Sequence, residues 1–153
     1  MVILNMTDPE TRYQTMLGRL KERGCRITSH RLALLLLIAS SEGHPNAAQL
    51  YEKLLKQFPT ASLATVYKTL TLLKEEGQVL EIDLHDTSHY DGNKPYPHPH
   101  LVCDRCGTIM DGDGVLFTSS ANQEIQETFE FQVTHSQMVF YGICRECQLQ
   151  LSG

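Results

Sequence analysis

The sequence lacks an apolar run long enough to cross a membrane. Its longest run spans only residues 32–39, whereas a membrane-spanning helix needs about 20 apolar residues. The first residues also lack the basic stretch and the small-residue cleavage site of a signal peptide. We therefore expect a cytoplasmic protein with no membrane partner. Thiols stay reduced in that compartment, so paired cysteines there bind metal more often than they form disulfides.

Internal repeats and low-complexity tracts are also absent from the sequence. The hydrophobic fraction of 41% allows a true core and argues against extended disorder. A chain of 153 residues has room for one ordinary domain, or for two small domains that need extra support.

Charge is distributed unevenly, although the net charge is only −5. Residues 12–79 carry ten Lys and Arg against five Asp and Glu, whereas residues 80–153 carry three against eleven. A basic half joined to an acidic half favours a polyanion-binding domain fused to a domain with a different partner. Uneven surface charge without a function is the alternative on charge alone.

The basic half has the pattern of short helices followed by a β-ribbon. Apolar spacing and capping residues predict helices over residues 11–23, 28–39, 46–57 and 63–76, and strands over residues 79–86 and 88–92. Asn46, with Gln49 three residues later, has the pattern of a capping box. Helices followed by a small ribbon are the order of a winged helix-turn-helix domain.

The predicted helix 63–76 has two distinct faces. Its apolar stripe consists of Leu63, Val66, Leu70 and Leu73. The other face carries small or polar side chains, which allow a helix to enter the major groove of DNA. The candidate DNA-binding residues on it are Ala64, Thr65, Tyr67, Lys68 and Thr71. A plain amphipathic helix with a solvated face is the alternative, but the preceding helix, the short turn and the local positive charge favour helix-turn-helix.

Residues 92–99, GNKPYPHP, predict a hinge because they are rich in Gly and Pro. Beyond it, residues 100–111 have the pattern strand, cysteine turn, strand. A helix over residues 115–129 and a strand over residues 131–141 follow. The predicted fold class is therefore α+β. We expect a DNA-binding domain at residues 1–91, the hinge, and a second domain at residues 100–153.

Four of the five cysteines form two C-x-x-C pairs, Cys103 with Cys106 and Cys144 with Cys147. Two thiolates from each pair complete a closed tetrahedral site, which suits structural Zn²⁺ and would stabilise a small domain. A redox dithiol is the alternative, but neither pair has the strand-then-helix context of a thioredoxin-like motif. Cys25 stands alone and is predicted to pack rather than to bind metal.

Several segments together resemble the ferric uptake regulator family, from about residue 12 to residue 148. They are GCRITSHRLALLLLI, GHPNAAQLYEKL, FPTASLATVYKTLTLLKEEGQV, PHPHLVCDRCGTIMD and FYGICREC. The resemblance implies a homodimeric bacterial transcription repressor that is not an enzyme. Its winged helix would bind double-stranded DNA with an AT-rich inverted repeat. A small C-terminal α/β domain would dimerise and hold one Zn²⁺ per subunit through the four cysteines.

The resemblance also implies a regulatory metal site with one Fe²⁺ or Mn²⁺ per subunit. Its ligands would be His44, Asp91, His98, His100 and Asp111. Nitrogen and oxygen donors of this kind suit either ion. Because the ligands come from both halves of the chain, metal binding and DNA binding would be thermodynamically coupled.

Three positions near this set depart from the family pattern. The stretch HYDGNKPYPHPH is one residue longer than usual, so Asp86 remains the alternative to Asp91. Some relatives have a further metal site, of which His135 would be a remnant. Pro97 and Pro99 stand where the other ligands of that site would be.

The two aspartates determine the expected signal. In the peroxide-sensing branch of the family, aspartates occupy both carboxylate positions, whereas iron-uptake regulators typically carry glutamates. Asp91 and Asp111 therefore resemble the peroxide sensors, in which bound Fe²⁺ reacts with H2O2 and the oxidant modifies ligand histidines. The equivalents here are His44 and His98. The alternative is a regulator that senses iron or another divalent metal by occupancy alone.

The family resemblance also places Arg26 near the minor groove or the DNA backbone. Many iron regulators carry Arg at the position of Lys68, and Lys lacks the bidentate fork of Arg, so base specificity is expected to be weaker there. A zinc enzyme that uses the His and Asp cluster is a further hypothesis from another class. Such an enzyme would not need the basic helix-turn-helix half.

Overall fold

The computed structural model describes residues 8–84, 86–112 and 119–153. The chain divides into two units, Met1–Tyr96 and Pro97–Gly153, and the division falls inside the predicted hinge. Within the described ranges, no helix combines the length and the apolar character of a membrane span. Helices and small sheets together give the α+β class that the sequence predicts.

Four helices of the first unit begin where a side chain caps them. They are α1 (Pro9–Glu22), α2 (Ser29–Ala39), α3 (Ala47–Gln57) and α4 (Leu63–Glu75). Thr28 and Ser62 each accept a hydrogen bond from the amide three residues later, and Asn46 forms the predicted capping box with Gln49. The predicted helices are confirmed to within two residues at each end. The sequence reasoning missed Asp8, which caps α1 from before the predicted start.

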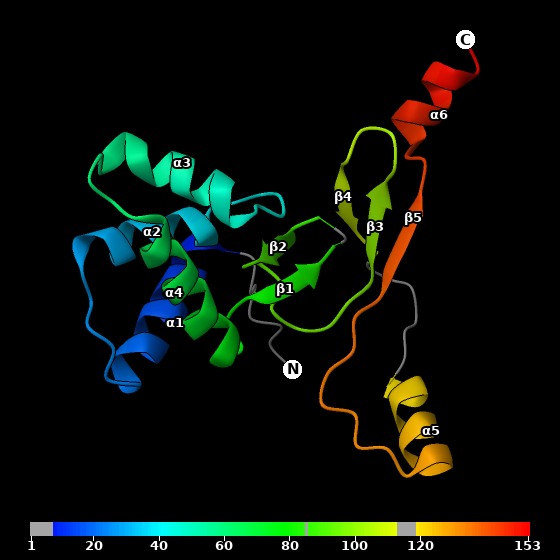
Figure 1. Cartoon of the computed structure of the whole chain (residues 1–153), viewed down its shortest axis with the longest axis horizontal. Helices are drawn as coiled ribbons and strands as arrows, with labels where there is room; N and C mark the ends of the chain where they lie inside the picture. The colour runs from blue at the N-terminus through cyan, green and yellow to red at the C-terminus, as the bar shows by residue number, and fades with distance from the viewer. Residues whose placement is uncertain (1–7, 85, 113–118) are drawn as a thin grey trace. The chain divides into compact units, whose positions relative to one another are not determined.

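A two-stranded antiparallel ribbon follows the helices and lies beside them (Figure 1). Strand β1 (Leu80–Asp83) pairs with β2 (Ser88–Asp91), and Leu80 stands opposite Asp91. On its other edge, β2 is bound to the segment that precedes α3. There the Tyr90 amide donates to the Pro45 carbonyl at 2.9 Å, and Asn46 bridges to His89. The ribbon therefore places the end of β2 next to the loop that carries His44.

The core of the first unit is built from the inner faces of α1 to α4. Its fully buried apolar side chains include Met16, Leu20, Leu34, Leu35, Leu50, Leu54, Val66, Leu70 and Leu73. Cys25 packs against this cluster and is half-buried, as the sequence predicts. Leu63 is 38% exposed. It is the first residue of α4, and the other three residues of the predicted apolar stripe are buried.

Truncation of Leu70 is expected to destabilise the first unit far more than truncation of Leu63. Leu70→Ala leaves a cavity in the core and should lower the free energy of unfolding by about 2–5 kcal/mol. Leu63→Ala is the matched control on the same helix and should cost less than about 1 kcal/mol. Urea unfolding followed by far-UV circular dichroism measures both values. Equal losses would contradict the assigned core face of α4.

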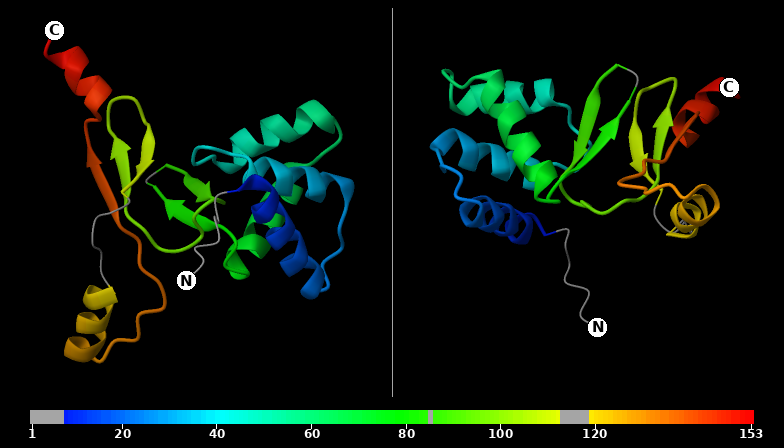
Figure 2. Two further views of the ribbon diagram at one scale, coloured as in Figure 1. Left: turned by 180° about the vertical axis from the view of Figure 1, so that it is seen from behind. Right: turned by 60° about the horizontal axis from the view of Figure 1, so that its bottom comes forward.

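The second unit contains a three-stranded sheet with β3 at its centre (Figure 2). Strand β3 (His100–Cys103) pairs antiparallel with β4 (Ile109–Asp111) and parallel with β5 (Val139–Gly142). Helix α5 covers Ser119–Phe129, and α6 covers Arg145–Leu151. The start of the predicted helix 115–129 lies outside the described residues, and α6 was not predicted.

The predicted strand over residues 131–141 is wrong for most of its length, because only Val139–Gly142 is strand and the structure continues it one residue further. The parallel register pairs Val139 with His100. Residues before Val139 would have to pair with the segment that ends in Pro97, His98 and Pro99. Proline has no amide hydrogen to donate, so the ladder stops there.

Candidate metal centres and nucleic-acid interface

The four paired cysteines lie at the ends of two neighbouring strands. Cys103 ends β3 and Cys106 follows it in a tight turn, which is closed by the Gly107 amide donating to the Cys103 carbonyl at 2.9 Å. Gly107 has φ of +73°, a left-handed conformation that glycine adopts without strain. Cys144 is the N-cap residue of α6, so its partner Cys147 lies in the first turn of that helix. The parallel pairing of β3 and β5 thus brings the two knuckles together.

The geometry of the sulfur atoms fits one tetrahedral zinc ion. One ligand atom from each of the four cysteines lies within 4.8 Å of all the others, and the Sγ atoms of Cys106 and Cys144 are 3.7 Å apart. Zn–S bonds of about 2.3 Å in a tetrahedron imply sulfur–sulfur distances of about 3.8 Å. Cys103, Cys144 and Cys147 are buried and Cys106 is exposed. Four protein ligands leave no open position on the ion, as in a structural site.

The thiols of this site differ in acidity. The Cys144 amide donates to Cys103 Sγ at 3.3 Å, and hydrogen bonds from this and other backbone amides lower the pKa of Cys103 to about 6. Burial raises the pKa of Cys147 to about 12. Zinc requires thiolates, so its binding must release protons, and zinc affinity must fall as the pH falls.

Replacement of one zinc ligand should release the ion and weaken the second unit. For Cys103→Ser, we expect a loss of zinc affinity greater than the roughly 10–100-fold that loss of an outer-shell partner costs. Cys25→Ser is the matched control, because Cys25 lies outside the cysteine cluster. Native mass spectrometry reports the zinc content, and thermal unfolding reports the stability. A Cys103→Ser chain that holds stoichiometric zinc would contradict the assignment.

In the first unit, His44 and Asp91 face each other. His44 Nε2 lies 3.3 Å from Asp91 Oδ2. The other oxygen, Oδ1, accepts hydrogen bonds from the amides of Asn93 at 3.0 Å and Lys94 at 2.9 Å. These amides fix the orientation of the carboxylate, as in an Asx-turn. On the histidine side, the Nδ1 atom of His89 lies 2.7 Å from the His44 carbonyl oxygen.

The turn after Asp91 is itself tightly held. A Cβ atom on Gly92 would lie 2.5 Å from Ile38 Cγ2, so only glycine fits against α2 there. The Asn93 side chain donates to the Ser41 carbonyl at 2.6 Å. The turn is therefore tied to the end of α2, from which the chain leads into the loop with His44.

In the second unit, His98, His100 and Asp111 form a second cluster. Antiparallel pairing places His100 opposite Asp111, and His100 Nε2 lies 3.6 Å from Asp111 Oδ1. His98 Nε2 lies 3.0 Å from the same oxygen. The two imidazole rings have centroids 4.3 Å apart. Imidazole and carboxylate donors of this kind fit a divalent ion such as Fe²⁺ or Mn²⁺.

Asp86, His30 and His135 belong to neither cluster. Asp86 is exposed in the turn between β1 and β2. His30 packs edge-on against Phe58, and His135 is exposed beside Thr134. His85, to which the sequence reasoning gave no metal role, lies outside the described residues.

The outer face of α4 is available to a partner. Tyr67 is 51% exposed, and the other candidate DNA-binding residues of this helix are Ala64, Thr65, Lys68 and Thr71. All of these are exposed except Thr65, which is half-buried. Arg26 is exposed as well. Arg31 connects the two regions, because its Nε donates to the buried Thr69 at 3.2 Å and its Nη1 to the Arg26 carbonyl at 2.5 Å.

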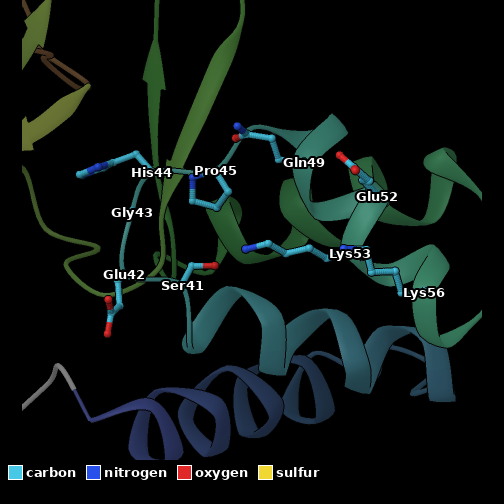
Figure 3. Close-up of a pocket in the computed structure, with 9 residues that line it drawn as sticks. All are labelled: Ser41, Glu42, Gly43, His44, Pro45, Gln49, Glu52, Lys53 and Lys56. Carbon is cyan, nitrogen blue, oxygen red and sulfur yellow. The ribbon is translucent and has the colours of Figure 1, made fainter. Parts of the chain in front are cut away.

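The loop with His44 also borders a surface hollow of about 450 Å³. Figure 3 shows that α3 supplies one side of it through Gln49, Glu52, Lys53 and Lys56, while His44 extends from the loop away from α3. The hollow carries both acidic and basic side chains, so its charge favours neither an anion nor a cation.

Arg12 is the residue that the sequence reasoning missed. It is 2% exposed and makes three hydrogen bonds within the first unit. A signal was present, because Arg12, Met16 and Leu20 follow each other at intervals of four residues on one face of α1. A charged residue on the buried face of a helix is rarely without a partner.

Comparisons with known proteins cover most of the chain. The ferric uptake regulator family matches residues 22–141. The chain is 36% identical over 143 residues to the peroxide-responsive repressor PerR of Staphylococcus aureus strain USA300. The aligned region covers 91% of this chain and 93% of that protein.

Solved structures give the same family. A structure of PerR from Streptococcus pyogenes, described as the basis for peroxide sensing and gene regulation, shares 34% identity and gives a TM-score of 0.50 over 90% of this chain and 93% of that chain. The ferric uptake regulator Fur of Helicobacter pylori gives a TM-score of 0.68 at 18% identity, over 92% and 93% of the two chains. The latter likeness concerns the fold alone.

Proposed function

This chain belongs to the ferric uptake regulator family, and from that premise we propose that it is a metal-dependent transcriptional repressor that responds to peroxide. The observation that carries the proposal is the pair of aspartates, Asp91 and Asp111. Each lies within 3.3 Å of a histidine of its own unit. The relatives at 36% and 34% identity are peroxide-responsive regulators by name. The protein acts in the cytoplasm and is not an enzyme.

We assign the regulatory ligands to the two His and Asp clusters, one in each unit. The assigned ligands are His44, Asp91, His98, His100 and Asp111. We assign zinc to the cysteine site because thiolates favour Zn²⁺. Imidazole and carboxylate donors suit Fe²⁺ or Mn²⁺. The chain's own residues orient the donors, since the amides of Asn93 and Lys94 fix one carboxylate and strand pairing fixes the other.

Regulation then follows from the coupling of ligand sets on both sides of the hinge. An Fe²⁺ ion held by these residues would promote the reduction of H2O2, and overall one H2O2 would transfer one oxygen atom to a ligand imidazole and leave one water molecule. Oxidised His44 or His98 loses its lone-pair donor strength, so the chain binds the ion less tightly. Because metal and DNA affinity are coupled, weaker metal binding means weaker DNA binding.

DNA recognition is assigned to α4 and to Arg26 in a homodimer. The two copies of α4 read the two halves of an AT-rich inverted repeat, since the symmetry of the dimer matches that of the site. Small residues such as Ala64 and Thr65 allow close approach to the groove, and Tyr67 and Lys68 reach bases or phosphates.

The peroxide response is tested by anaerobic loading with Fe²⁺, followed by one equivalent of H2O2. We expect DNA affinity to fall by about 5–150-fold, the range typical of coupled sites. Peptide mass spectrometry should find one added oxygen on the peptides that contain His44 or His98. Chain loaded with Mn²⁺ is the control and should keep both its mass and its DNA affinity. The affinity itself is measured by fluorescence anisotropy.

A second comparison addresses the aspartates. Asp111→Glu should still bind Fe²⁺ and DNA but should gain less oxygen at equal peroxide. Unmodified histidines with DNA still bound, in the native chain, would instead support a regulator that senses metal by occupancy alone.

Removal of the Lys68 charge should weaken specific DNA binding. We expect Lys68→Ala to lose about tenfold in affinity, which corresponds to about 1.4 kcal/mol and lies within the range of a base-edge contact. Lys56→Ala on α3 removes the same charge elsewhere and should change the affinity less than twofold. Equal losses in the two variants would mean that α4 is not the recognition helix. Titrations at several salt concentrations separate phosphate contacts from base contacts.

A further inference from the structure

Arg12 bridges the two strands at the open end of the β-ribbon, where Leu80 stands opposite Asp91. Its Nη2 donates to the Gln78 carbonyl at 2.6 Å, just before β1 begins, and its Nε donates to the Gly92 carbonyl at 2.7 Å, just after β2 ends. The side-chain oxygen of Gln78 lies 3.4 Å from Nη1. A planar guanidinium with several fixed donors can bind two carbonyls at once, which a lysine cannot do in the same geometry.

The first of these carbonyls is fixed to the end of α4. Gly77 follows the last residues of the helix, and the Gln78 amide donates back to the Leu73 carbonyl at 2.8 Å. Gln78 is 7% exposed. Any displacement of the Gln78 carbonyl therefore involves the C-terminal turn of the proposed recognition helix.

The second carbonyl is adjacent to Asp91. Gly92 packs so closely on Ile38 that a Cβ there would lie 2.5 Å from Ile38 Cγ2, and the Asn93 side chain donates to the Ser41 carbonyl. The Arg12 hydrogen bond adds a further contact to this turn. The two charges are also coupled through space, because the Asp91 carboxylate raises the pKa of Arg12 against the larger, lowering effect of burial.

Burial makes the loss of an Arg12 hydrogen bond costly in free energy. Arg12 is 2% exposed, and a buried guanidinium that loses a carbonyl partner leaves donors without water to replace it. The Gly92 and Gln78 carbonyls, which flank the Leu80–Asp91 pair, are therefore linked by a buried side chain as well as by strand pairing.

We propose that Arg12 is a positioning residue that transmits metal occupancy at Asp91 to the end of the recognition helix. The inference rests on the proposed function, in which Asp91 is a regulatory ligand and α4 contacts DNA. An ion bound by the Asp91 carboxylate shifts the turn with Gly92 or makes it more rigid. Arg12 carries that change to Gln78 and so to α4, without contacting either the ion or the DNA.

The test is the ratio of DNA affinities with and without Mn²⁺, measured on full-length chain that retains its zinc. The probe is a duplex selected in vitro for binding by the native chain. Native coupling should lie in the 5–150-fold range, and Arg12→Lys should reduce that ratio by at least about fivefold. Arg19→Lys is the matched control, since Arg19 is an exposed arginine on the same helix, and should keep the native ratio.

A purely structural role makes a different prediction. If Arg12 only stabilises the fold, Arg12→Lys would lower DNA affinity equally with and without Mn²⁺. An unchanged ratio of the two affinities would therefore overturn the inference. Asp91→Asn is measured in parallel. If Asp91→Asn keeps the coupling, Asp91 is not the regulatory ligand and the proposed function fails at that residue. If Asp91→Asn abolishes the coupling while Arg12→Lys keeps it, only the role of Arg12 fails.

Amide hydrogen exchange on the native chain provides a second test, which does not depend on the folding of Arg12→Lys. Saturation with Mn²⁺ should slow amide exchange around Gln78 as well as around Asn93. Slower exchange around Asn93 alone would show that occupancy is not transmitted to the end of α4 and would overturn the inference.

Discussion

The register of β3 is the constraint on which both ligand sets of the second unit depend. Side chains alternate along a strand, so His100 and Cys103 project from opposite faces of β3. Pairing with β4 sets His100 opposite Asp111, and pairing with β5 brings the knuckle after Cys103 to the knuckle at Cys144. A slip of one residue would exchange the two faces and destroy both sets at once. Zinc at the cysteines would favour one register, because only that register assembles four thiolates.

In the first unit, backbone contacts hold the two candidate ligands, His44 and Asp91, in place. His44 and Asp91 are brought together by the edge of β2, through Tyr90 and Pro45, and by the tight turn at Gly92. Hydrogen bonds from backbone amides do most of the orienting. Such bonds survive side-chain substitution elsewhere, so the carboxylate keeps its direction as long as the turn keeps its backbone. This arrangement requires a buried arginine, whose donors depend on the Gln78 and Gly92 carbonyls at the open end of the ribbon.

Local signals in the sequence were sufficient for the helices of the first unit, because capping residues such as Thr28, Asn46 and Ser62 act within one turn. The cysteine cluster was also predictable, since two C-x-x-C pairs in one small domain typically form a tetrahedral zinc site. The extent of strand pairing was not predictable from such local signals. Alternating apolar residues over 131–141 fit a strand, but the length of that strand is set by the prolines that precede His100. Arg12 was missed for a related reason, because its partners lie far along the chain, at Gln78 and Gly92.

The separation of the two metal sets by donor type explains how one small protein can use metal as both scaffold and signal. A buried site of four thiolates binds zinc firmly and exchanges it slowly, so it cannot report on a changing ion pool. Imidazole and carboxylate donors are less selective: by the general order of affinities, zinc would compete with Fe²⁺ and Mn²⁺ for them. Selectivity at the regulatory donors must therefore come from metal availability and from ligand geometry. Asp91 is short and is held by two backbone amides, so it has little freedom to adapt to a poorly fitting ion. In the proposed mechanism, that rigidity lets an ion at Asp91 act on the turn with Gly92, and the Arg12 side chain links this turn to the end of α4.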